Sequence, residues 1–179
     1  MINVKLGDFF TTKNPMALGI AINAVQKVWS RDNRSEYSHA GIITSDLGDT
    51  LEALWTVKNQ NLFEAYAGEN VLVARYTGHP WTLEFKAETA IYKLRKKHEG
   101  QVYPIWRLPF QLIPPLAKYL TWRGKFCVCS ELVAEYLHMI GARHDQFMGT
   151  NPDTLADEWH RWKDFEIIHE GILPSSPNW

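Results

Sequence analysis

The sequence predicts an α+β protein in which an antiparallel sheet packs against helices, and three segments carry that prediction. Between residues 38 and 55, two short apolar segments flank the turn-rich residues 45–49, which is typical of a β-hairpin. Residues 71–75 (Val-Leu-Val-Ala-Arg) have the composition of a buried strand. From residue 129 to 141, apolar side chains recur with the period of an amphipathic helix.

The elements before residue 101 follow from local patterns. Residues 3–7 are expected to open into a strand or turn, and residues 15–29 favour a helix. A short helix is expected within residues 61–67. Residues 83–98, rich in Ala, Glu and Lys, favour a longer helix that ends near Gly100.

Local patterns also predict the elements of the C-terminal half. Four prolines break the apolar and aromatic residues 102–122, so they do not favour a single helix and are expected to line or cap a cleft. Asn151 caps a helix that is expected to run to about residue 162, and residues 165–169 favour a closing strand. No internal repeat or linker interrupts the chain, so residues 1–179 are expected to form a single domain.

Composition narrows the function classes. The formal net charge of −1 disfavours a nucleic-acid-binding protein, which usually has a basic surface. No signal peptide is recognised, and the apolar residues 16–28 are too short for an integral membrane segment. We therefore expect a soluble cytoplasmic or virion-associated protein. The two cysteines, Cys127 and Cys129, are too close in sequence for a disulfide framework.

Cys129 is the first candidate for chemistry. Leu132, Val133, Tyr136 and other apolar residues of the same helical period follow it, which places the thiol at a helix N-terminus. Unpaired backbone N–H groups and the positive end of the helix dipole favour the thiolate there, and the thiolate is the nucleophilic form. Cys127 is interpreted as a small buried apolar residue.

His39 and Glu52 are the candidate base and its orienting group. If Ile43 pairs with Thr50 in the predicted hairpin, Gly41 pairs with Glu52. Glu52 then lies diagonal to His39 on the same face of the sheet, whereas a slip of one residue would separate them. A carboxylate in that position fixes the orientation and tautomer of an imidazole.

Four segments in this order resemble a known family: Gly7-Asp-Phe-Phe10, Ser38-His-Ala-Gly-Ile42, Leu51-Glu-Ala53 and Cys129-Ser-Glu-Leu-Val133. They are similar to the motifs of the YiiX-like, circularly permuted NlpC-type cysteine hydrolases. The resemblance implies a papain-like fold in which the histidine strand precedes the nucleophile helix. It also implies Cys129 as nucleophile, His39 as base and Glu52 as the third polar residue. The chain departs from the family in having Cys127, and Pro104 where many relatives have an aspartate.

The function that follows is that of a cysteine amidase or peptidase without a cofactor or metal. Its expected substrate is an amide bond in a peptidoglycan stem peptide or a related small peptide. Tyr37, Ser38 and Tyr103 are the candidate residues for binding the substrate or the oxyanion, and the Cys129 backbone N–H is expected to stabilise the oxyanion with them.

Three alternatives remain open. The first is acyl transfer or lipid-amide cleavage, as in the lecithin retinol acyltransferase-like group, whose nucleophile motif is Asn-Cys-Glu-His rather than Cys-Ser-Glu. The second is a non-catalytic module within a larger assembly such as a phage particle. The third is a zinc site built from Cys127, Cys129 and a histidine, although structural zinc usually takes cysteines spaced two to four residues apart.

Overall fold

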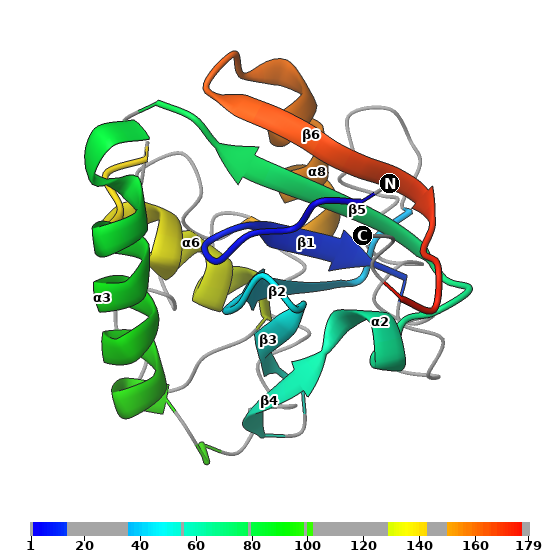
Figure 1. Ribbon diagram of the computed structural model, residues 1–179, viewed down its shortest axis with the longest axis horizontal. Coiled ribbons are helices and arrows are strands. Elements are labelled where there is room, and N and C mark those ends of the chain that lie inside the picture. Colours follow the sequence, from blue (N-terminus) through cyan, green and yellow to red (C-terminus); the bar gives the residue numbers. More distant parts are fainter. Residues whose placement is uncertain are drawn as a thin grey trace.

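The computed structural model describes residues 2–13, 36–54, 56–78, 80–98, 100–101, 129–142 and 150–176. These residues form a mixed α+β structure around one antiparallel sheet of six strands, in the order β4-β3-β2-β1-β5-β6 (Figure 1). The strands are β1 (Phe9–Thr12), β2 (His39–Ile43), β3 (Asp49–Ala53), β4 (Val57–Asn61), β5 (Asn70–Tyr76) and β6 (Phe165–Ile172). The predicted antiparallel sheet and α+β class are confirmed.

Four described helices accompany the sheet: α2 (Leu62–Ala65), α3 (Pro80–His98), α6 (Cys129–Met139) and α8 (Pro152–Arg161). Both α6 and α8 pack on the sheet, and α3 packs against α6 (Figure 1). The helices predicted after residues 61, 83, 129 and 151 are therefore confirmed. The helix predicted at residues 15–29 and the apolar residues 102–122 lie outside the described residues. No described helix is both long and apolar enough to cross a membrane.

Two apolar clusters cover the opposite faces of the sheet. Successive side chains of a strand point to opposite faces, so Phe9 joins the larger cluster with α6 and α8, whereas Phe10 joins the smaller cluster with α2. Both phenylalanines are fully buried. Because β1 is covered on both faces, its four residues lack the alternation by which a strand is recognised from sequence.

The pairing of β2 with β3 confirms the predicted register. Gly41 pairs with Glu52, and Ile43 pairs with Thr50.

Two strands of the sheet were not predicted. β1 lies beyond the strand or turn expected at residues 3–7, and β4, with the sequence Val-Lys-Asn-Gln-Asn, has a composition that disfavours strands. Pairing with β3 along its whole length holds β4 in the sheet.

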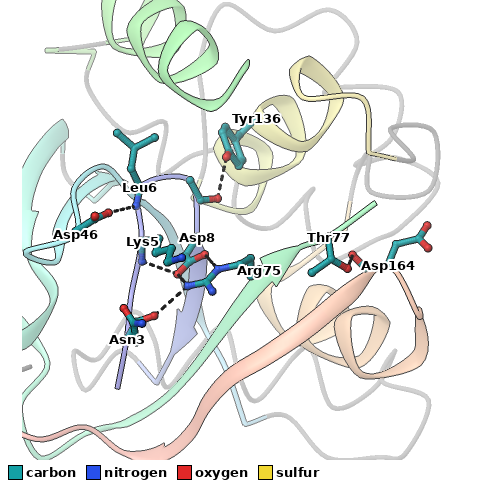
Figure 2. Close-up of polar contacts among 10 residues, drawn as sticks. Asn3, Lys5, Leu6, Asp8, Asp46, Arg75, Thr77, Tyr136 and Asp164 are labelled. Atoms are coloured by element: carbon teal, nitrogen blue, oxygen red, sulfur yellow. Dashed lines mark hydrogen bonds and ion pairs between the residues drawn. The ribbon is translucent and has the colours of Figure 1, made fainter. Parts of the chain in front are cut away.

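Contacts from β5 and α6 fix the turn that leads into β1 (Figure 2). Arg75 on β5 binds both carboxylate oxygens of buried Asp8, at 2.7 Å from Nε and 2.8 Å from Nη2. Tyr136 on α6 donates a hydrogen bond to the carbonyl oxygen of Gly7 at 2.8 Å. Gly7 has a φ of 94°, and a Cβ there would lie 2.8 Å from the Tyr136 hydroxyl oxygen. The turn therefore requires glycine, and it ties α6 to the sheet.

Candidate active site

Cys129 is the first residue of α6, as the helical period predicted. The first turn of a helix leaves backbone N–H groups without intrahelical partners, and the thiol lies at this end of α6. Helix α6 packs on β2 and β3, the strands that carry the other two candidate residues. Cys129 is 5% exposed, and is therefore more buried than reactive cysteines usually are.

His39 and Glu52 form a buried hydrogen-bonded pair. The His39 Nε2 atom lies 2.7 Å from Glu52 Oε2, and the two residues are 3% and 0% exposed. His39 begins β2, and Glu52 lies on β3 diagonal to it, on the face predicted from the hairpin register. The polar contact therefore depends on a single register of two neighbouring strands.

The Cys129 side chain completes this group, because it interacts with the His39 side chain and raises the pKa of the imidazole. Because Nε2 of the ring contacts Glu52, Nδ1 is the nitrogen left for the thiol. Cys129 belongs to the apolar cluster on the α6 face, whereas the His39 ring lies near Phe10 and Tyr66 of the opposite cluster. The structure thus brings together the three residues that are separated by up to 90 positions in sequence, at the start of β2.

The charges of this group favour the imidazolium form of His39. Burial by itself lowers the pKa of His39, but hydrogen bonds and charge interactions with Cys129 and Glu52 outweigh burial and raise the pKa to about 10. Burial by itself raises the pKa of Glu52, but its hydrogen bond and charge interaction with His39 leave that pKa below the ordinary value. Glu52 is therefore a carboxylate at neutral pH, paired with a protonated imidazole.

Glu52 has two further hydrogen-bond partners that the sequence reasoning missed. Thr50 Oγ1 donates to Glu52 Oε1 at 2.5 Å, and the Tyr66 hydroxyl donates to Oε2 at 2.5 Å. The contact of Thr50 with Glu52 could have been predicted from the sequence, because residues two apart on a strand share a face. No sequence pattern indicated the contact of Tyr66 with Glu52, since β4 and α2 lie between the two residues in the chain.

The candidate oxyanion residues are placed as follows. Tyr37 precedes β2 and is 4% exposed, and its hydroxyl has no hydrogen-bond partner among the residues that the structure describes. Its pKa is raised by burial and then by the charge of nearby carboxylates, the largest contribution being that of Glu170, so the hydroxyl stays protonated. The backbone N–H of buried Ser38 donates to the Thr12 carbonyl oxygen at 3.0 Å. Tyr103 lies outside the described residues, as does Cys127. The role of these residues in binding the oxyanion stays a prediction.

The raised pKa of His39 predicts a pH dependence of stability. The folded protein holds the His39 proton more tightly than the unfolded chain, where the ordinary value is 6.5. The stabilisation is thus complete below pH 6.5 and is lost as the pH rises towards about 10. Within this window the free energy of unfolding should fall by up to about 1.4 kcal/mol per pH unit because of this group.

Urea unfolding of the wild type and of His39→Gln at several pH values measures this contribution. Glutamine does not titrate, so the stability difference between the two proteins should shrink steadily from neutral to alkaline pH. A difference that stays constant over the window would mean that His39 is not protonated in the folded protein.

The fold and the site together define a mixed α+β protein in which an antiparallel sheet and helix α6 bring a cysteine, a histidine and a glutamate together. Among solved structures, YiiX of Escherichia coli O157:H7, which is described as a metalloprotein, has a similar fold. The likeness has a TM-score of 0.55 at 20% sequence identity and covers 98% of this chain and 90% of that chain. At this identity the likeness concerns the fold, which is YiiX-like. No protein-family model matches the sequence. No curated protein matches it either.

A metal centre needs several ligating side chains that converge on one point. In the described ranges, no group of three or more His, Cys, Asp or Glu side chains is arranged to hold a metal ion. Both oxygens of Glu52 and the Nε2 atom of His39 are engaged in short hydrogen bonds with one another and with hydroxyls. The described residues therefore do not fit a metal centre, and a zinc site that includes Cys127 falls outside them.

Proposed function

We propose that this chain is a cysteine amide hydrolase of the circularly permuted NlpC-type, papain-like kind. The observation that carries the proposal is the buried series of interacting side chains from Cys129 through His39 to Glu52, in which His39 and Glu52 are hydrogen-bonded. A thiol at a helix start, an imidazole beside it and a carboxylate behind the imidazole are the three parts of a thiol hydrolase. The order of the three residues in sequence is that of the permuted family.

In the proposed reaction the Cys129 thiolate attacks the amide carbonyl carbon and forms a C–S bond. The carbonyl oxygen becomes an oxyanion, and its proposed stabilising donor is the Cys129 backbone N–H at the start of α6. The imidazolium of His39 gives its proton to the leaving amine as the C–N bond breaks, which leaves a thioester. A water molecule then gives a proton to His39 and attacks the thioester, which releases the acid and restores the thiolate.

The proposed role of Glu52 is to hold His39 and to stabilise its positive charge. Its carboxylate is completely buried, and the hydrogen bond that it accepts from Nε2 keeps the other ring nitrogen directed at the thiol. The expected substrate remains an amide in a peptidoglycan stem peptide or a related small peptide. That choice rests on the sequence resemblance, since the catalytic group alone acts on any accessible amide or ester.

Thiol reactivity tests the proposal without requiring the substrate. Iodoacetamide at neutral pH should alkylate Cys129 at least about tenfold faster than Cys127, because Cys129 begins α6 and lies beside the His39 imidazolium. The labelled residue is identified by peptide mass spectrometry. A His39→Ala variant is the matched control, and its Cys129 should react more slowly. Equal labelling of the two cysteines in the wild type would contradict the assignment.

The same protein is then assayed on peptidoglycan fragments, small peptides and acyl-amide substrates. Cleavage of a stem peptide supports the amidase assignment, whereas cleavage confined to lipid amides supports the lecithin retinol acyltransferase-like alternative. A wild type that cleaves none of these substrates and reacts with iodoacetamide no faster than free cysteine would support the non-catalytic module.

A further inference from the structure

Glu52 is held by hydroxyl groups on both of its oxygens, in addition to its contact with His39. The Tyr66 hydroxyl lies 2.5 Å from Oε2, the same oxygen that is 2.7 Å from His39 Nε2. The Thr50 hydroxyl lies 2.5 Å from Oε1. The carboxylate is thus fixed at both ends, and the plane of the carboxylate is defined as well as its position.

Tyr66 is itself held rigidly. It follows α2, a helix of four residues whose N-cap, Asn61, accepts hydrogen bonds from the backbone N–H groups of the first turn. The Tyr66 N–H donates to the Leu62 carbonyl oxygen at 3.0 Å, and the residue is 8% exposed. Its ring centroid lies 5.6 Å from that of Phe10 and 6.1 Å from that of His39. The hydroxyl therefore approaches Glu52 from a fixed direction.

We propose that the hydroxyls of Tyr66 and Thr50 are a pair of positioning groups that hold Glu52 in the rotamer from which Oε2 binds His39 Nε2. Each of these two hydroxyls donates its hydrogen bond to the Glu52 carboxylate, and not to the thiol. Both act through the carboxylate. The inference deepens the proposed hydrolase function, and its hydrogen-bond geometry can be tested whether or not a substrate is found.

The chemistry of the group requires such an anchor. A glutamate has three rotatable side-chain bonds, and a single contact with an imidazole does not select one rotamer. Burial and the charge of Glu52 raise the pKa of Tyr66, so its hydroxyl stays protonated and donates to the carboxylate. The Gln60 side chain acts in the opposite direction and lowers the pKa of Tyr66. The other titratable groups that act on Glu52 and Tyr66 are His39 on β2 and the Cys129 side chain on α6.

The test follows the titration of His39 by NMR of its imidazole nitrogens in the full-length protein. Tyr66→Phe keeps the ring and removes only the hydroxyl, and Thr50→Val removes the other hydroxyl at nearly constant volume. Each should lower the measured pKa of His39 by roughly 1, because a carboxylate that is less well placed stabilises the imidazolium less. On a cleaved substrate, kcat should fall about tenfold in each variant with KM unchanged.

Tyr136→Phe is the matched control, since it also removes a buried tyrosine hydroxyl but breaks a hydrogen bond to the Gly7 carbonyl oxygen instead. It should leave the titration of His39 at the wild-type value. A second comparison uses Glu52→Gln. In that background Tyr66→Phe should not shift the His39 titration further, because the tyrosine acts through the carboxylate.

Folded Tyr66→Phe and Thr50→Val proteins with the wild-type His39 titration would overturn the inference. An equal shift from Tyr66→Phe in the Glu52→Gln background would also overturn it, because the tyrosine would then act directly on the imidazole. If one variant fails to fold, the other provides the same measurement. Absence of hydrolysis by the wild type would instead count against the proposed function, since the titration is read independently of activity.

Discussion

Cys129→Ala is expected to abolish hydrolysis while leaving the protein folded. Removal of the nucleophile takes away the covalent route, and the rate should fall by a factor on the order of 10⁵ or more. The loss of stability should be only about 1 kcal/mol, because the change removes one sulfur atom and its interaction with His39 from a buried site. The measurements are the hydrolysis rate on the substrate panel and the free energy of unfolding in urea.

Cys127→Ala provides the matched control, since it removes the neighbouring thiol but not the residue that begins α6. It should keep wild-type activity. If Cys129→Ala retained a substantial part of the rate, the nucleophile would lie elsewhere. Loss of activity in Cys127→Ala alone would reverse the roles of the two cysteines.

Gly41→Ala is expected to have the second largest effect, because it disturbs the position of Glu52 without changing any polar group. A Cβ on residue 41 would lie 2.6 Å from Phe10 Cε1 and 2.9 Å from Glu52 Cγ. Both neighbours are fully buried and cannot move into solvent. Overpacking of this kind costs about 1–3 kcal/mol of stability. Displacement of the carboxylate by about 1 Å should lower kcat by roughly 10²-fold.

Gly68→Ala separates the two effects of the added methyl group. Gly68 has a φ of 81° and nothing within 4 Å of the position of a Cβ, so its substitution strains the backbone without pushing a neighbour. It should lower stability by about 1–2 kcal/mol and leave hydrolysis unchanged. Equal losses of activity in the two variants would show that general destabilisation, rather than displacement of Glu52, accounts for the result at Gly41. Urea unfolding and hydrolysis rates of both variants provide the comparison.

Local sequence patterns were sufficient for the parts of the site that depend on short-range geometry. The position of Cys129 at the start of α6 follows from the helical period after it, because the pattern itself locates the helix. The position of His39 and Glu52 on the same face of the sheet follows from the hairpin register, because side chains along a strand alternate with a period of two. The α+β class and most element boundaries depend on the same two periods.

The remaining features were decided by tertiary structure, because their causes lie far apart in the chain. Strand β4 has a polar sequence and is held by pairing with β3. Tyr66 reaches Glu52 only because β4 and α2 bring it back over the sheet, and no local pattern encodes that return. The sequence alone indicated Cys129, His39 and Glu52 as the candidate residues for chemistry. Packing of α6 on β2 and β3 decided that Cys129 meets His39, since contact between distant segments is set by which faces are buried together.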